Sequence, residues 1–476
     1  MTRHSGKIAL LAALVVAALT GVGAWPAQGA GAAAAQTAPL LRVGTSGDYT
    51  PFSLLTPADD AATGAGNYSG LDIEVARRFA NDRGYSLEFV PFKWPDLAHD
   101  LAAGRFDVAM SGVTMRGDRS VIGRFTIPVV ASYAVALSWS GAHATSIGQL
   151  NRRDRRIAVN AGGYLEGVAR KVFPAAQIIA LPNNDAVHMA LLDRWTDAVV
   201  TDNLEEKQWA AGAADVVRIG PLSDDRKAYL VRADREDLAA ELDTWLLAHE
   251  HDGTLARLRA GITGEAGGAP VSAPLPALIN AIVERMSIMP LVWAAKDKAA
   301  LPVQDSAQEQ RVLDAAVAAV TAAAKAASRP PPDPEPVRTL FRAMIEAGKE
   351  IQQRLADRRY AQEQQARQRK DARSATSQSG SAVESPNTAG AEIEIDAQKT
   401  ATALFDLDTQ IRPAIAHITV KLARLLVALD TPLTSEAVQR PLSAALAGQR
   451  LRTGHTEEMS SSIAALSVAN SANRRD

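Results

Sequence analysis

The pattern of apolar residues changes once along this chain, at about residue 276, and this change limits the fold more than any other feature. Before it, short apolar runs typical of strands alternate with helical patterns, as in Ser86–Pro91 followed by Trp94–Ala103. After it come long Ala- and Leu-rich helical patterns such as Ala307–Ser328. Alternating strands and helices favour α/β units with a largely parallel sheet. We therefore expect a multidomain chain, α/β first and all-α second.

The N-terminus has the layout of a secretory signal peptide. Arg3 and Lys7 precede an apolar run from Ile8 to about Leu19, and small residues follow. The alternative, a membrane anchor, is disfavoured because the run is short and Ala-rich. The absence of cysteine excludes a lipoprotein anchor, disulfides and thiolate metal sites. We expect a periplasmic or secreted protein with no membrane segment after cleavage of residues 1–38.

Composition sets the other expected boundaries. The α/β domain is expected at 39–263, a Gly-, Ala- and Pro-rich linker at 264–275, the helical domain at 276–468 and a frayed tail at 469–476. Residues 367–398 are polar and low in aromatics, which predicts a disordered insert in the helical domain. The net charge is -2, and no basic stripe favours nucleic acid.

Four motifs of the α/β region stand in the order and spacing of the periplasmic amino-acid-binding family. They are Arg42–Phe52, Gly70–Ala76, Gly104–Gly112 and Phe125–Pro128. The resemblance covers about Leu41 to Gly261 and implies two α/β lobes with a ligand cleft between them. Because ligands of open α/β sheets bind beyond the carboxyl ends of the strands, the strand pattern indicates the same cleft.

Polar residues after one of these strands could bind a carboxylate. Ser111 and Thr114 offer hydroxyl groups, and Arg119 offers a guanidinium suited to bidentate hydrogen bonds. Taken alone, Arg119 is better explained as a solvated charge beside Asp118. The resemblance implies instead that Arg119 anchors the carboxylate of a ligand that Asp48 also contacts.

A narrower resemblance, to cyclohexadienyl dehydratase, rests on Pro91–Leu97, Asn160–Gly163, Thr201–Glu205 and Lys227–Leu230. It implies conversion of prephenate to phenylpyruvate, and of arogenate to phenylalanine, with loss of water and carbon dioxide. Glu205 matches the general acid, which burial can keep protonated near neutral pH. Lys227 would bind a carboxylate, and Trp94 would form an apolar wall.

Both assignments have plain alternatives. Asp202-x-x-Glu205 is also a capping box at the start of a helix, and Trp94 also fits a core position. The sequence departs from this family after Gly163, where Tyr164 and Leu165 replace a polar pair.

The C-terminal region resembles the exported helical chorismate mutases over about Leu275 to Leu466, apart from the polar insert. The motifs are Glu284–Met286, Lys296, Leu301–Asp305, Phe341–Gln352 and Ile411–Ile415. The resemblance implies rearrangement of chorismate to prephenate. Relatives of both domains self-associate, which favours a homo-oligomer.

Arg285 and Lys296 are eleven residues apart, or three helical turns, and project from nearly one face of an apolar helix. Chorismate is a dianion, so a catalyst must clamp two carboxylates and stabilise charge on the ether oxygen. Arg285 and Arg412 are the expected clamps, and Lys296 and Gln352 the expected donors. The alternative for Arg285 and Lys296 is a solvated helix face.

Two acidic residues, Asp305 and Glu309, are further candidates for substrate contact. Glu309 matches a residue that holds the substrate hydroxyl in relatives, and it equally fits a capping box in Ser306-x-x-Glu309. Gln308 stands where relatives have a clamping arginine, with Arg311 one turn away. Gly348 stands where relatives often have a small hydroxyl residue.

Because prephenate is the product of one chemistry and the substrate of the other, the sequence predicts a bifunctional enzyme without metal or cofactor. Its partners would be the small molecules chorismate, prephenate and arogenate. The alternative function is a non-catalytic amino-acid-binding protein with a helical partner-binding appendage. Such a protein would keep Arg119 but would not need Glu205.

Overall fold

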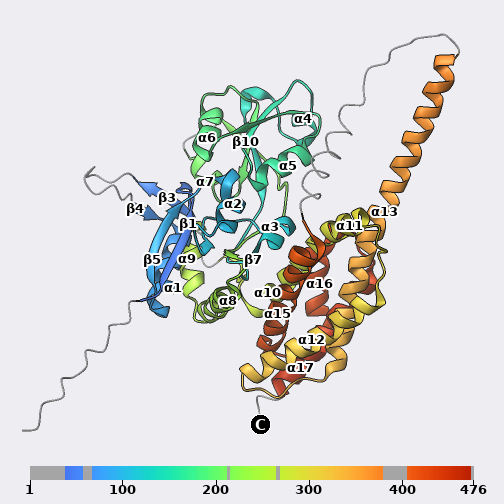
Figure 1. Ribbon diagram of the computed structural model, residues 1–476. Coiled ribbons are helices and arrows are strands. Elements are labelled where there is room, and N and C mark those ends of the chain that lie inside the picture. The colour runs from blue at the N-terminus through green and yellow to red at the C-terminus, as the bar shows by residue number, and fades with distance from the viewer. Residues whose placement is uncertain (1–37, 57–66, 212–214, 264–267, 379–404, 473–476) are drawn as a thin grey trace, which may run out of the picture. The chain divides into compact units, whose positions relative to one another are not determined.

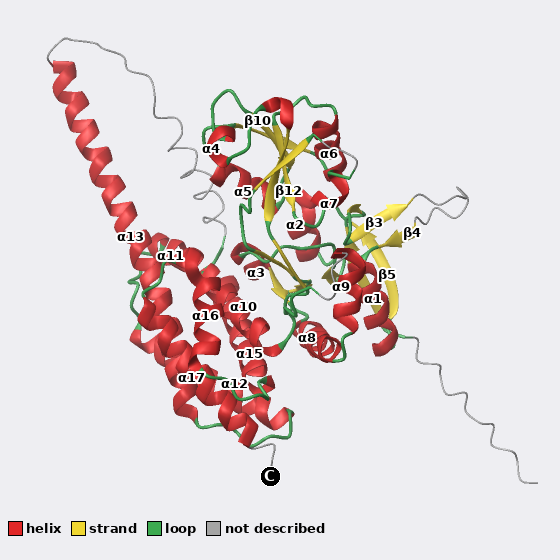
Figure 2. Ribbon diagram, turned by 180° about the vertical axis from the view of Figure 1, so that it is seen from behind, coloured by secondary structure: helices red, strands yellow, loops and turns green. Residues whose placement is uncertain are grey.

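The computed structural model describes residues 38–56, 67–211, 215–263, 268–378 and 405–472. The signal peptide expected at 1–38 therefore lies outside the described residues, apart from Ala38. Two α/β lobes are followed by a set of helices (Figures 1 and 2), as the sequence predicted.

The first lobe is built on a five-stranded sheet in the order β5-β1-β6-β15-β7. Its strands are β1 Leu40–Thr45, β5 Ser86–Pro91, β6 Val108–Ala109, β7 Gly123–Phe125 and β15 Leu230–Arg232. The helices that belong to this lobe are α1 Leu71–Arg83, α2 Leu97–Ala102, α3 Gly117–Ile122, α8 Glu236–His251 and α9 Thr254–Thr263. A short meander of β2 Asp48–Tyr49, β3 Ser53–Thr56 and β4 Asn67–Ser69 follows β1.

The second lobe has its own five-stranded sheet, in the order β11-β10-β12-β9-β13. Its strands are β9 Ala134–Trp139, β10 Arg156–Asn160, β11 Gln177–Leu181, β12 Ala198–Asp202 and β13 Val216–Ile219. Its helices are α4 Ile147–Leu150, α5 Tyr164–Val172, α6 Asn184–Leu192 and α7 Glu206–Trp209.

The chain passes between the two sheets along β8 Val130–Ser132 and returns along β14 Asp225–Lys227, and these two strands pair with each other. This double crossing corrects the expectation of a largely parallel sheet. The returning strand β15 runs antiparallel to β6 and β7, and β9 runs antiparallel to β12 and β13. Both sheets are therefore mixed, and the crossing strands lie beside the cleft.

The C-terminal region is helical throughout its described part. The helices are α10 Pro274–Ser287, α11 Met289–Lys298, α12 Ser306–Ala326, α13 Pro334–Gln378, α15 Arg412–Ala428, α16 Ser435–Leu446 and α17 Thr453–Ala472. A π-helical turn, Leu407–Ile411, precedes α15. Leu278, Phe341, Leu422 and Met459 come from four of these helices and are all buried in one apolar core.

Three boundaries differ from those expected. The helix that carries Arg285 and Lys296 breaks at Ile288, because Pro290 in the first turn of α11 has no N–H to continue it. α13 runs on to Gln378, into the expected insert, through residues with high helix propensity. The remainder of the insert, 379–398, lies outside the described residues.

The tail expected to fray from residue 469 instead continues α17 to Ala472. Buried Asn470 explains this difference, because its amide Nδ2 donates hydrogen bonds to the carbonyl oxygens of Leu426 (2.8 Å) and Leu429 (3.2 Å).

One later segment does have the length and composition of a membrane span, contrary to expectation. In Pro274–Lys298, which comprises α10 and α11, 72% of the most apolar window is buried inside the protein. Burial of this kind is typical of a core helix in a helical domain.

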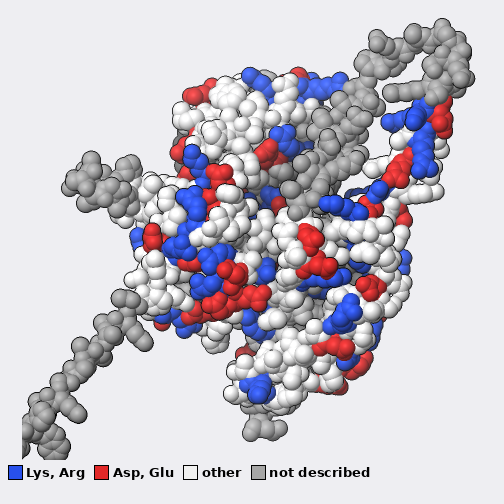
Figure 3. Space-filling model, viewed as in Figure 1, with Lys and Arg blue, Asp and Glu red and all other residues white. Residues whose placement is uncertain are grey.

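On the face shown in Figure 3, basic and acidic side chains are interspersed.

Candidate active sites

The cleft of the α/β domain is closed by polar side chains from both lobes. Tyr49 of the first lobe donates a hydrogen bond to the carboxylate of Asp202, at the end of β12 in the second. Lys227, the last residue of β14, has its Nζ 2.7 Å from Tyr49 Oη and 3.2 Å from Asp202 Oδ2. All three side chains are buried. The expected cleft residue Lys227 thus lies where the lobes meet.

Glu205 follows β12 and is buried in the same cleft. The Thr201 hydroxyl donates to Glu205 Oε2 over 2.6 Å. Asp202 Oδ1 accepts the backbone N–H of Glu205 at 3.0 Å, so Asp202 does cap this turn. The Glu205 carboxylate, however, accepts a hydrogen bond from Thr201, so only the Asp202 half of the capping box is formed. It is therefore available to the cleft.

Burial, followed by the negative charge of Asp202, raises the pKa of Glu205 well above its ordinary value. Lys227 and the hydrogen bond from Thr201 act in the opposite direction. Desolvation disfavours the charged form of a carboxyl group, so Glu205 retains its proton to higher pH than a solvated glutamate. A neutral carboxylic acid in a closed cleft can donate a proton to a bound ligand.

The expected carboxylate-binding residues of the first lobe also lie together. Thr114 Oγ1 accepts a hydrogen bond from Lys227 Nζ at 3.0 Å, and the Thr114 carbonyl accepts one from Arg119 at 3.2 Å. The Ser111 hydroxyl accepts the backbone N–H of Ser46 at 3.0 Å. Thr114 therefore links Arg119 to Lys227, the residue at which the lobes meet.

Arg119 is buried, with 7% of its surface exposed, and is not the solvated charge that its neighbour suggested. Asp118 pairs instead with Arg116, at 2.5 Å. Burial, and then the charge of Arg116, lowers the pKa of Arg119 to about 10. A guanidinium that is desolvated and lies near another cation favours an anionic partner.

Trp94 packs against neighbouring aromatic rings and also contacts the candidate residue Asp48. Its ring meets those of Tyr49 and Phe92 edge-on, with centroids 5.8 and 5.4 Å apart. Its Nε1 donates to Asp48 Oδ1 at 3.3 Å. The two candidates Trp94 and Asp48 are therefore direct neighbours.

The departure from the family at residues 164–165 is accommodated inside the second lobe. Tyr164 interacts through its hydroxyl with Asp225, and burial raises the pKa of that hydroxyl. Leu165 packs against the apolar core of this lobe. The polar pair of the family is thus replaced by one core residue and one residue bonded to a buried carboxylate.

A cavity of about 390 Å³ lies among the helices of the C-terminal domain. All six residues expected to form the second site line it: Arg285, Lys296, Asp305, Glu309, Gln352 and Arg412. Among the described residues, its charged lining also includes Arg311 and Lys349. Five cations and two carboxylates give the lining an excess of three positive charges, which favours an anionic ligand.

Arg285 is buried in the wall of this cavity, with 4% of its surface exposed. Its NH1 lies 3.5 Å from the Thr419 hydroxyl, a weak hydrogen bond. Burial lowers its pKa to about 10. The neighbouring Glu284 cannot neutralise it, because Glu284 is paired with Lys421 at 2.8 Å. The expected clamp is thus a buried cation whose partner would be a ligand.

Lys296 and Gln352 face the same cavity from different helices. Lys296 Nζ donates a hydrogen bond to the Val303 carbonyl at 2.6 Å. This bond uses one of the three N–H groups of the lysine ammonium. Burial, the largest effect, lowers the pKa of Lys296, opposed by Asp305 and Glu309. Gln352 donates from Nε2 to the Gly348 carbonyl at 3.2 Å. The helix break at Ile288 therefore did not separate Lys296 from the site.

The two acidic candidates have a capping role as well. Asp305, and not Ser306, caps α12, since its Oδ1 accepts the backbone N–H of Gln308 at 2.9 Å. Glu309 Oε1 accepts the backbone N–H of Asp305 at 3.3 Å. The N-cap thus lies one residue earlier than predicted, at Asp305, while Glu309 still accepts the N–H of the cap residue and also lines the cavity.

Arg412 is half-exposed at the cavity edge and pairs with Asp408. Gln308 accepts hydrogen bonds through its Oε1 from Arg311 Nε and NH2, at 3.0 and 2.7 Å. Arg311 thus reaches Gln308, the position at which the resemblance implied an arginine. Sequence reasoning missed two residues, Lys349 and Tyr49, although both lie inside the quoted motifs.

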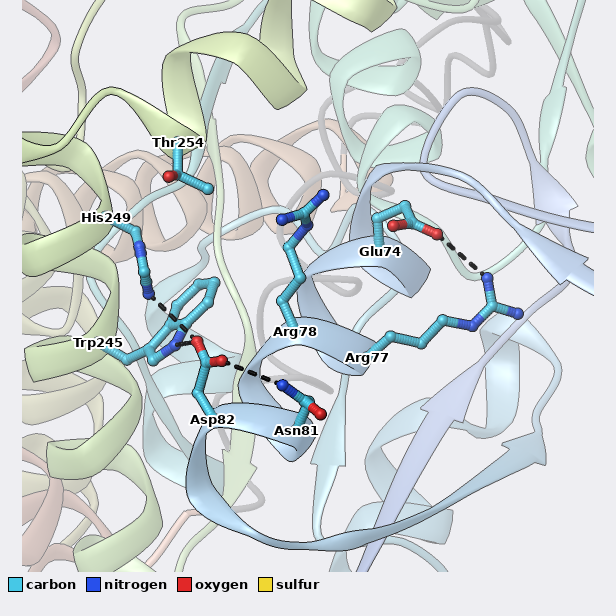
Figure 4. Close-up of a pocket in the computed structure, with 8 residues that line it drawn as sticks. All are labelled: Glu74, Arg77, Arg78, Asn81, Asp82, Trp245, His249 and Thr254. Atoms are coloured by element: carbon cyan, nitrogen blue, oxygen red, sulfur yellow. Dashed lines mark hydrogen bonds and ion pairs between the residues drawn. The ribbon is translucent and has the colours of Figure 1, made fainter.

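A second pocket, of about 380 Å³, lies between α1 and α8 and contains none of the expected residues. Figure 4 shows Asp82 at one end, where it accepts from Trp245 Nε1 at 2.9 Å. On the other side Arg77 pairs with Glu74 at 3.2 Å. The four side chains named here therefore form polar contacts with one another.

Comparisons with known proteins agree with both halves of this architecture. Residues 41–265 match the family of bacterial extracellular solute-binding proteins, family 3, and residues 276–353 match chorismate mutase type II. Over 221 residues the chain is 32% identical to the cyclohexadienyl dehydratase of Pseudomonas aeruginosa, covering 45% of this chain and 80% of that protein.

Two further relatives bind amino acids by name. A "Probable histidine-binding protein" of Neisseria gonorrhoeae is 29% identical over 31% of this chain and 52% of that protein. The crystal structure of an ancestral amino acid-binding protein, a precursor of cyclohexadienyl dehydratase, is 30% identical over 47% of this chain and 95% of that chain, with a TM-score of 0.43. The chain therefore belongs to the bacterial extracellular solute-binding proteins of family 3, and it carries a chorismate mutase type II domain after the solute-binding domain.

Proposed function

We propose that this chain is a bifunctional exported enzyme, in which the helical domain rearranges chorismate to prephenate and the α/β domain dehydrates and decarboxylates prephenate to phenylpyruvate. Arogenate, which would give phenylalanine, is the second substrate class for the α/β domain. The observation that carries the proposal is the charge of the two sites. One holds an excess of cations around a cavity, and the other holds a buried acid.

In the helical cavity no covalent catalysis is needed. Arg285 and Arg412 would bind the two carboxylates of chorismate and hold its folded conformer, which removes much of the entropic barrier. The C–O bond of the ether then breaks while the new C–C bond forms. Lys296 and Gln352 would donate hydrogen bonds to the ether oxygen as negative charge develops there. The amide of Gln352 donates without depending on protonation near neutral pH.

In the cleft, neutral Glu205 would give its proton to the ring hydroxyl of prephenate, which leaves as water. The electrons of the bond to the ring carboxylate move into the ring, and carbon dioxide is released. Aromatisation supplies the driving force. Arg119 and Lys227 would bind the substrate carboxylates, and Trp94 would flank the ring. Glu205 then regains a proton from water once the lobes open.

The test is to give chorismate to the purified full-length chain. Appearance of phenylpyruvate, read from its ultraviolet absorbance in alkali, supports both activities. Accumulation of prephenate alone would support the mutase and contradict the dehydratase. No turnover, together with tight binding of an amino acid in calorimetry, would instead favour the binding-protein alternative, which the names of two relatives also suggest.

A further inference from the structure

Lys349 is the one cation on α13 that lines the helical cavity among the described residues. It follows Gly348, where an added Cβ would lie 2.8 Å from Met289 Sδ. The glycine therefore lets α13 approach α11 closely beside the cavity, and the next side chain emerges at its wall. Lys349 is half-buried, with 20% of its side chain exposed. Its position is set by the same packing that shapes the cavity.

The ammonium group of Lys349 lies across from α12. Its Nζ is 3.2 Å from Glu309 Oε2 and 2.6 Å from Glu346 Oε1. The other oxygen of Glu309 accepts the backbone N–H of Asp305, so this carboxylate is fixed by the start of α12. A fixed carboxylate holds the ammonium toward the cavity, whereas Glu346 is exposed and outside its lining.

Residue 308 of α12, which lines the cavity, is a glutamine and carries no charge. The Gln308 amide oxygen is occupied by Arg311, whose side chain is exposed. Lys349 approaches the cavity beside the next residue of α12, Glu309. Lys349 and Lys296 both line this cavity, so the two ammonium groups share it.

We propose that Lys349 is a specificity-determining residue of the mutase site, where its ammonium binds one carboxylate of the substrate beside the uncharged Gln308. This inference rests on the proposed mutase function. Glu309 acts as a positioning residue, because it touches Lys349 and holds it at the wall. Lys349 has three donors, so one can bind a substrate carboxylate while another stays with Glu309.

The test compares Lys349→Gln with Glu346→Gln, which removes the exposed partner of Lys349 and leaves the cavity lining intact. For Lys349→Gln the KM for chorismate should rise by about 10- to 100-fold, the usual effect of losing a charge-assisted hydrogen bond, with a smaller change in kcat. Glu346→Gln should retain the wild-type KM. Adding Gln308→Arg to Lys349→Gln should restore most of the lost affinity.

A wild-type KM in Lys349→Gln, or an equal rise of KM in Glu346→Gln, would overturn the inference. If the wild-type chain does not rearrange chorismate at all, the proposed function fails separately. In that case calorimetry with malonate, a short dicarboxylate, still decides on Lys349. Weaker binding in Lys349→Gln than in both other chains supports a carboxylate site at Lys349, and equal binding in all three contradicts it.

Discussion

In the cleft of the α/β domain the buried cation Lys227 has a carboxylate partner, whereas the buried Arg285 of the helical cavity has no ion-pair partner among the described residues. Lys227 and Asp202 form an ion pair at 3.2 Å, and Tyr49 joins them. Arg285, equally buried, has only a distant hydroxyl. These two buried cations are therefore held in opposite ways.

The difference follows from how each site is built. Two lobes linked by β8 and β14 can close on themselves, and closure brings side chains of opposite charge together. In the helical cavity, by contrast, Arg285 is buried in the wall with a single weak hydrogen bond. A ligand of the cleft must replace the existing ion pair with bonds of its own. A ligand of the cavity would meet in Arg285 a cation that is already desolvated, an arrangement that favours electrostatic stabilisation.

The largest effect should come from the buried acid of the cleft. In Glu205→Gln the proton donor is lost, and dehydration should fall by about 10²- to 10⁴-fold, the usual contribution of a general acid. Rearrangement of chorismate should be unchanged, so prephenate should accumulate when chorismate is supplied. Chromatography of the reaction mixture measures both products.

Stability provides the control for Glu205→Gln. Burial raises the pKa of Glu205, so its contribution to stability is present at low pH and is lost as pH rises through the raised pKa. The neutral glutamine should therefore be at least as stable as wild type in alkaline solution. A variant that unfolds, or that dehydrates prephenate normally, would contradict the role given to Glu205.

The second test concerns the buried pair beside the cavity. Lys421 and Glu284 are 2.8 Å apart, with 1% and 2% of their side chains exposed. Lys421→Met leaves an unpaired buried carboxylate and should lower the free energy of unfolding by about 3 to 5 kcal/mol. Urea unfolding followed by helical circular dichroism measures the loss.

Glu284→Gln added to Lys421→Met removes the unpaired charge and keeps an oxygen for the Ser120 hydroxyl, which donates to Glu284 Oε1 at 3.0 Å. The double variant should therefore regain most of the stability. If the single and the double variant are equally unstable, the loss comes from packing and not from charge.

The third test uses the neighbour of Glu284 on the same helix. Arg285→Met removes a buried cation that pays the cost of desolvation without an ion-pair partner among the described residues. Mutase activity should fall by about 10²- to 10³-fold, as when one preorganised donor is removed. Stability should stay the same or rise, unlike in Lys421→Met.

Arg285→Lys is the matched control, since it keeps the charge and loses the planar fork. It should retain more activity than Arg285→Met. Destabilisation of Arg285→Met as severe as that of Lys421→Met would show that Arg285 is a structural residue, and the contrast between the two sites would no longer hold.

Much of this arrangement could be predicted from motifs, because the candidate site residues stand at strand ends or at fixed helical spacing. Glu205 and Arg285 are of this kind. Lys349 is not, because a lysine on a helix acquires a role only when the facing helix is known. The helix break at Ile288 was not predicted, because the apolar periodicity continues through it. The helical hydrogen bonding does not continue, since Pro290 has no backbone N–H.

The sequence of α17 hides its buried face. Ser460 and Ser467 are fully buried, and their hydroxyls donate to the backbone carbonyls of Thr456 (2.6 Å) and Ala464 (2.7 Å). A serine satisfied in this way packs as a small apolar residue. Apolar counting therefore treats these positions as solvent-facing, although they belong to the core.

The smallest effect should come from the group that restrains the acid of the cleft. Thr201 donates a 2.6 Å hydrogen bond to Glu205, and this bond lowers the pKa of Glu205 against the larger effect of burial. In Thr201→Val the charged form loses that bond, so the pKa should rise further. The alkaline limb of the dehydratase pH profile should then move to higher pH, while the rate at low pH changes by less than about tenfold.

Thr201→Ser keeps the hydroxyl and should retain the wild-type profile, which separates the hydrogen bond from packing. A limb that moves to lower pH in Thr201→Val would mean that the hydroxyl stabilises the neutral acid, so its bond to Glu205 would have the opposite sense to the one seen here. A limb that does not move in Thr201→Val would assign the alkaline limb to a group other than Glu205.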